Sequence, residues 1–220
     1  VSVRIRILLA FLLTWMVYPL TDWPLIDPTS AEGLKAVFYQ VFVGVLMGIL
    51  LQIVNAALII GGQAVSASMG LSMANMVDPS MGNVPVIAQF FVICSTLIFL
   101  GLGGHVLVIS LLLESFELLP INSALDLQGL LKLTIEWSAM MFLGAILIGL
   151  PLMASLLFIN IGLGVITRTA PALNIFAVGF PAMILAGIVL LSLSMTSIGY
   201  RIQWLWQESF EIIGQALGIR

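Results

Sequence analysis

The chain has 220 residues, of which 61% are apolar and 8% are charged, against roughly a quarter charged in an ordinary soluble domain. Seven Lys and Arg residues against ten Asp and Glu residues give a formal net charge of -3. The chain therefore lacks the basic surface of a nucleic-acid-binding protein. With so little polar surface, it must place its apolar side chains against lipid or against other protein subunits.

Long charge-free stretches dominate the sequence, at 36–77, 79–113, 137–167 and 169–200. Each is longer than the roughly 20 apolar residues that cross a hydrocarbon core of ~30 Å. Helices satisfy their own backbone hydrogen bonds in lipid, so we expect an all-α protein with long apolar helices. These predicted helices lie near residues 5–20, 36–60, 85–113, 137–167 and 172–198. Pro151, Pro171 and Pro181 are expected to kink the later helices or to start new ones.

The two ends of the chain carry different signals. Arg4 and Arg6 precede an apolar run but no small-residue cleavage site follows, so this run is interpreted as a retained helix, not a signal peptide. We expect a single domain over residues 1–220, with N-terminal residues missing. The last 22 residues predict an amphipathic helix. It would lie either at a membrane interface, which suits Trp204 and Trp206, or against a partner protein. Its apolar face comprises Ile202, Leu205, Trp206, Phe210, Ile213 and Leu217.

The distribution of Lys and Arg residues does not indicate how the chain is oriented in a membrane. Cytoplasmic loops are normally enriched in Lys and Arg. Here the loops on one side of the predicted helices carry three of these residues and the loops on the other side carry four. Two explanations remain open. Missing N-terminal residues would tip the balance, or the apolar helices are covered by partner subunits and do not follow a rule for independent insertion.

Small residues and amides mark a candidate packing surface. Nine of the residues in 61–75 are Gly, Ala or Ser, which allow helix backbones to approach closely. Gln52 and Asn55 lie one turn apart, and amides buried in an apolar setting need partners. We predict subunit packing at Gln52, Asn55, Gly61, Gly62 and Gln63. A helix interface within one chain is the alternative.

Catalytic and cofactor chemistry finds little support. His105 and Cys94 are the sole histidine and cysteine, and on one helix they would lie roughly 16 Å apart, too far for a nucleophile and its base. GLGGH at 101–105 lacks the Lys-Ser/Thr ending of a phosphate-binding loop. We expect a protein that is not an enzyme and has no cofactor and no metal. A small-molecule permease remains an alternative, although Asp78 and Arg168 beside prolines are more typical of helix ends.

Residues 69–85 form a methionine-rich segment, MGLSMANMVDPSMGNVP. Methionine is flexible and fills irregular apolar space, while Gly and Pro interrupt a helix. Non-helical backbone at membrane depth survives only inside protein or along a water-filled cavity. The segment therefore predicts a pore lining or a deformable seal, with core filling by methionine as the alternative.

Three runs of sequence resemble the FliR/SctT family of type III secretion export proteins. They are GGQAVSASMGLSMANMVDPSMGNVPVIAQF (61–90), GGHVLVISLLLESFELLPI (103–121) and LPLMASLLFINIGLGVITRTAPALNIFAVGFP (150–181). The resemblance covers nearly the whole chain and favours the flagellar branch over the virulence branch. It implies a subunit of a closed, helical export gate in the bacterial inner membrane, at the flagellar basal body.

The same resemblance implies partners and site residues. The partners would be FliP-like and FliQ-like subunits, which sheathe one another's helices, together with FlhB-like and FlhA-like export proteins. The substrates would be unfolded flagellar proteins. A loop equivalent to 73–85 would plug the pore, with glycines and prolines that let it swing aside. The predicted plug residues are Gly70, Met73, Met76, Val77, Asp78, Pro79, Met81, Gly82, Asn83 and Pro85.

Overall fold

The computed structural model describes residues 2–21, 23, 26–27, 29–71, 85–121, 126–169 and 175–218, except for the side chains of 175–178. Within them every regular element is helical, which confirms the all-α prediction. The elements are α1 (Val3–Val17), the 3-10 turn η1 (Tyr18–Leu20), α2 (Ala31–Ser68), α4 (Val86–Gly101), α5 (Gly104–Leu118), α6 (Leu127–Ser138), α7 (Met140–Thr169) and α8 (Ile175–Leu217).

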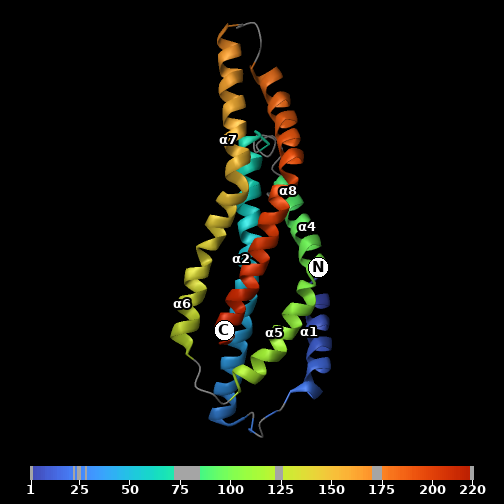
Figure 1. Cartoon of the computed structure of the whole chain (residues 1–220). Coiled ribbons are helices and arrows are strands. Elements are labelled where there is room, and N and C mark those ends of the chain that lie inside the picture. Colours follow the sequence, from blue (N-terminus) through green and yellow to red (C-terminus); the bar gives the residue numbers. More distant parts are fainter. Residues whose placement is uncertain are drawn as a thin grey trace.

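The helices form an elongated bundle around α2, which packs against α4, α6, α7 and α8 (Figure 1). One buried cluster joins α2, α4, α7 and α8 and includes Val54, Phe91, Leu152 and Ile202. A second cluster, towards the start of α2, includes Met47, Trp137 and Ile213. The C-terminal end of α7 and the N-terminal end of α8 extend past the C-terminal end of α2, so this pair of helices projects from the bundle (Figure 1).

Helix α2 is longer in both directions than the predicted span of 36–60. It begins at Ala31 because the Ser30 hydroxyl oxygen accepts a hydrogen bond of 3.0 Å from the Gly33 N–H and so caps the first turn. It continues to Ser68 through the small-residue stretch, which packs closely on neighbouring helices. Gly61 lies against Ala145 of α7, and Gly62 lies against Ala88 of α4.

The predicted helix over 85–113 is two helices. α4 ends at Gly101 and α5 begins at Gly104, with a bend of 66° between them. Gly103 lies at the break with a φ of 70°, a left-handed conformation that costs glycine little. The single-helix prediction was wrong here because a run of apolar residues carries no signal for a break between two helices.

In contrast, the apolar helix predicted over 172–198 and the amphipathic helix after it form one element, α8. The predicted apolar face is confirmed, since Ile202, Leu205 and Ile213 are almost fully buried. That face packs within the chain, against α2 and α4. Pro151 and Pro181 lie inside α7 and α8, which continue through them; Pro171 lies outside the described residues.

Four of the described helical segments are long and apolar enough to cross a membrane, or five if the bent pair α4–α5 is one span. Helix α1 is the most isolated of them, because only 6% of its span is buried. The ring of Trp23, just after η1, stacks on Tyr18 and also contacts Phe116 of α5, with ring centroids 5.8 Å apart. α1 thus lies along the flank of the bundle beside α5 (Figure 1).

Candidate functional site

The predicted plug lies mostly outside the described residues, and only its two flanks can be placed. The structure does not describe Met73, Met76, Val77, Asp78, Pro79, Met81, Gly82 or Asn83. Gly70, at the end of α2, and Pro85, at the start of α4, are both described. Contacts with neighbouring helices fix the positions of both flanks.

On the α2 side, the helix ends in a Schellman motif. The Leu71 N–H donates to the Ser66 carbonyl at 3.1 Å, and the Gly70 N–H donates to the Ala67 carbonyl at 3.0 Å. Gly70 has a φ of 80°, which a residue with a Cβ adopts only at a cost. The chain therefore leaves α2 in one defined direction.

Contacts with α8 hold this end of α2 in place. Met69 is 1% exposed, and a Cβ on Gly187 would lie 2.5 Å from its terminal methyl carbon. A Cβ on Gly70 would lie 3.1 Å from the ring of Phe180. Met69 therefore fills the core. This agrees with the alternative interpretation of the methionine-rich segment, in which its methionines fill core space.

On the α4 side, Pro85 stands at the N-cap position, with its carbonyl accepting a hydrogen bond of 3.1 Å from Gln89. The first turn of α4 then packs directly on α2, since a Cβ on Gly62 would lie 2.4 Å from the Cα of Ala88. Both flanks of residues 72–84 thus belong to one tightly packed pair of helices.

The five residues predicted for subunit packing divide into two groups. Gly61 and Gly62 are buried and contact α7 and α4 of the same chain. Gln52 and Gln63 are exposed on α2, and Asn55 is partly buried. The glycines therefore serve packing within the chain, whereas Gln52 and Gln63 present amides on the outside of an apolar helix.

Buried hydrogen bonds between helices were not predicted. The Trp206 Nε1 donates to the Ser95 hydroxyl at 2.9 Å, which joins α8 to α4. The Leu50 carbonyl in α2 accepts from the Trp137 Nε1 at 3.1 Å and from the Ser209 hydroxyl at 3.3 Å. The apolar spacing of α8 predicted that Trp206 lies on the apolar face, at a membrane interface or on a partner, and nothing in the sequence identified Ser95 of the same chain as its hydrogen-bond acceptor.

The family model for bacterial export proteins, family 1, matches residues 1–209. The chain belongs to this family. The flagellar biosynthetic protein FliR of Pectobacterium carotovorum subsp. carotovorum is 33% identical over 215 residues, which cover 97% of this chain and 82% of that protein. FliR of Escherichia coli (strain K12) is 32% identical, with 97% and 82% covered, and FliR of Aquifex aeolicus (strain VF5) is 31% identical, with 94% and 81% covered.

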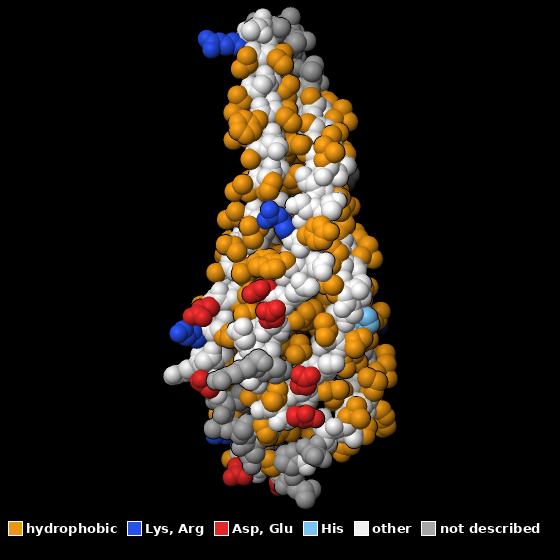
Figure 2. Space-filling model, in the orientation of Figure 1, with side chains coloured by type: hydrophobic (Ala, Val, Ile, Leu, Met, Phe, Trp, Pro, Cys, Tyr) orange, Lys and Arg blue, Asp and Glu red, His pale blue; other side chains and the backbone are white. Residues whose placement is uncertain are grey.

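The FliR-family chain has the character of a membrane-embedded export protein. Hydrophobic side chains cover most of the face drawn in Figure 2, while acidic side chains gather over its lower half. Within the described residues, no group of three His, Cys, Asp or Glu side chains could hold a metal ion. His105 is exposed in the first turn of α5, beyond the bend that separates it from Cys94.

Proposed function

We propose that this FliR-family chain is a subunit of the flagellar type III export gate, in the bacterial inner membrane at the flagellar basal body. It assembles there with FliP-like and FliQ-like subunits and contacts FlhB-like and FlhA-like proteins. Unfolded flagellar proteins pass through the resulting pore. The methionine-rich segment at 73–85 plugs this pore until a substrate arrives.

The length of the exposed apolar surface carries this proposal. Gly61 of α2 contacts Ala145 of α7, and the two helices run in the same direction (Figure 1). Exposed apolar side chains lie on α2 between Leu34 and Ile49 and on α7 between Phe142 and Ile166, below and above this contact. At 1.5 Å per residue, Leu34 and Ile166 are separated by about 70 Å along the two helices, more than twice the ~30 Å of a hydrocarbon core. Lipid covers only part of such a surface, so apolar helices of other subunits must cover the rest.

The exposed amides support the same conclusion. Gln52 and Gln63 stand on α2 between apolar neighbours, and an amide in an apolar setting is costly without a hydrogen-bond partner. Across a subunit interface, side-chain amides on neighbouring helices satisfy one another. We assign Gln52 and Gln63 to such an interface, with Asn55 at its edge.

The fixed flanks support the plug. A seal must close reproducibly, which requires defined anchor points, and Gly70 and Pro85 provide them at one end of the α2–α4 pair. Met73, Met76, Val77 and Met81 would supply deformable apolar contacts that exclude water and ions. Proline at 79 and glycine at 82 have low helix propensity, which suits a segment that must change shape.

Affinity purification of the tagged full chain from its native cells, followed by mass spectrometry of the intact complex, tests the assembly. We expect FliP-like and FliQ-like subunits in a fixed ratio. Gln63→Ala and Gln52→Ala should reduce their recovery several-fold. Gln128→Ala, an exposed glutamine on the amphipathic helix α6, is the matched control and should leave recovery unchanged.

Two outcomes would contradict the proposal. A stable, monodisperse monomer in detergent would show that the apolar surface needs no partner. Solute-dependent uptake into vesicles that contain this chain alone would instead support a small-molecule permease.

A further inference from the structure

A groove between α7 and α8 has no role in the export gate proposed above. Its volume is about 680 Å³, and it is lined by Leu147 of α7 and by one face of α8 between Leu193 and Trp204. Pockets of roughly 300–1,000 Å³ are the usual size for small-molecule sites. The groove is wide open to the surface, so it suits a ligand that lies along α8 better than one that is enclosed.

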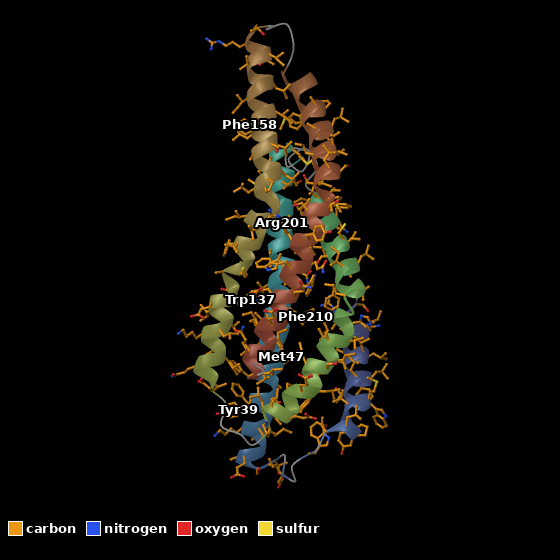
Figure 3. All side chains as sticks on the ribbon, viewed as in Figure 1. Tyr39, Met47, Trp137, Phe158, Arg201 and Phe210 are labelled. Carbon is orange, nitrogen blue, oxygen red and sulfur yellow. The ribbon has the colours of Figure 1, made fainter. Side chains whose placement is uncertain are left out.

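Arg201 gives this groove its charge. It is the only charged residue between Arg168 and Glu208, and its side chain is partly buried. Lys132–Glu136 is the one ion pair within the described residues, so Arg201 has no acidic partner among them. Glu208 lies two turns further along α8, about 10 Å away along the helix axis. Arg201 is labelled in Figure 3 between α7 and α8, and Figure 2, in the same orientation, shows one cation at this height with hydrophobic side chains around it.

The side chains beside Arg201 change in character along α8. Towards the start of the helix, Leu185, Val189 and Leu193 form an exposed apolar stripe at four-residue spacing. At the level of Arg201 the lining turns polar and aromatic, with Ser197, Tyr200 and Trp204. A cation with Tyr and Trp side chains at the end of an apolar stripe is the pattern of a membrane interface.

We propose that this groove binds the phosphate headgroup of an anionic phospholipid. The guanidinium of Arg201 pairs with the phosphate, because its planar donors match phosphate oxygens. The hydroxyls of Thr196 and Ser197 add hydrogen-bond donors, and one acyl chain lies along Leu193, Val189 and Leu185. The stripe from Arg201 to Leu185 is about 24 Å long, enough for one leaflet of a ~30 Å hydrocarbon core.

Native mass spectrometry of the purified full complex in nanodiscs tests this site. The nanodiscs contain either phosphatidylglycerol or phosphatidylcholine, and the measurement is the number of phospholipids that stay bound. We expect the wild-type complex to retain phosphatidylglycerol preferentially. Arg201→Gln should reduce this preference about fivefold, the contribution of one basic residue near anionic lipid, and Arg201→Lys should keep part of it. Arg168→Gln, at the exposed end of α7, is the matched control and should change nothing.

A second measurement places the lipid in the groove. Brominated phosphatidylglycerol should quench tryptophan fluorescence less in Trp204→Phe than in the wild type. The control is Trp15→Phe on α1, which measures how much of the quenching comes from an exposed tryptophan outside the groove. Adding inorganic phosphate should not displace the lipid; displacement would assign the groove to a free phosphate. Equal retention of both lipids, an Arg201→Gln complex with unchanged preference, or a partner's carboxylate paired with Arg201 in the assembled complex would overturn the proposal.

Discussion

The indole nitrogen of Trp206 donates a hydrogen bond of 2.9 Å to the hydroxyl of Ser95, and both side chains are buried. The two residues lie 111 positions apart and connect α8 to α4. The Trp206 ring also packs on Phe99, with centroids 4.7 Å apart, and on Phe210. A polar contact inside an aromatic cluster thus fixes the position of α8 along α4.

Ser95→Ala should lower the free energy of unfolding by about 1–3 kcal/mol, because the Trp206 N–H is left buried without an acceptor. Thr96→Ala is the matched control. The Thr96 hydroxyl bonds only to the Val92 carbonyl in its own helix and is exposed, so its loss should cost less than ~0.5 kcal/mol. Denaturant titration in detergent, followed by tryptophan fluorescence, compares the two variants. Equal stabilities would show that the hydrogen bond between the helices does not hold α8.

Gly62→Ala should separate α2 from α4, because the new Cβ would lie 2.4 Å from the Cα of Ala88, and backbone cannot move aside as a side chain can. The expected cost is about 1–3 kcal/mol, as for other overpacked cores. Gly48→Ala on the same helix meets nothing within 4 Å and should stabilise the chain by up to ~1 kcal/mol through helix propensity. Thermal unfolding of the two variants should therefore shift in opposite directions.

Gly70→Ala tests the fixed exit from α2. At a φ of 80°, a Cβ costs about 1–2 kcal/mol, and it would also press on Phe180. We expect lower stability and reduced flagellar export, measured as motility in soft agar. Gly101→Ala, at the end of α4 with open space around it, is the control. Normal motility of Gly70→Ala at wild-type protein level would contradict a role for this exit geometry in placing the plug.

Deletion of residues 73–83 should open the gate. Without the apolar seal, ions should pass and the membrane conductance of the cells should rise. Expressing the same deletion without the FliP-like subunit should abolish the leak, because no pore assembles. An unchanged conductance in the fully assembled complex would reject the plug.

The apolar helices and the family could be predicted from sequence, and the breaks in the helices could not. Composition favours helices in the long charge-free stretches, because a helix satisfies its own backbone hydrogen bonds in lipid. The break at Gly103 and the unbroken course of α8 past Tyr200 were not predicted, since a local apolar pattern does not distinguish a bent helix from a straight one. Glycine at 103 permits the turn, and the turn places α5 against α8.

The candidate site shows the same division. By its residues alone, the segment 69–85 is methionine-rich and interrupted by glycine and proline, which predicts a deformable apolar seal. The docking of the helices, in contrast, places Met69 in the core, packs Gly61 and Gly62 within the chain, and brings Trp206 to Ser95. Each of these depends on contacts between residues far apart in sequence. Which side chain contacts a given glycine or indole N–H depends on how whole helices pack together. That packing depends on the shapes of all their surfaces, which the local sequence does not give.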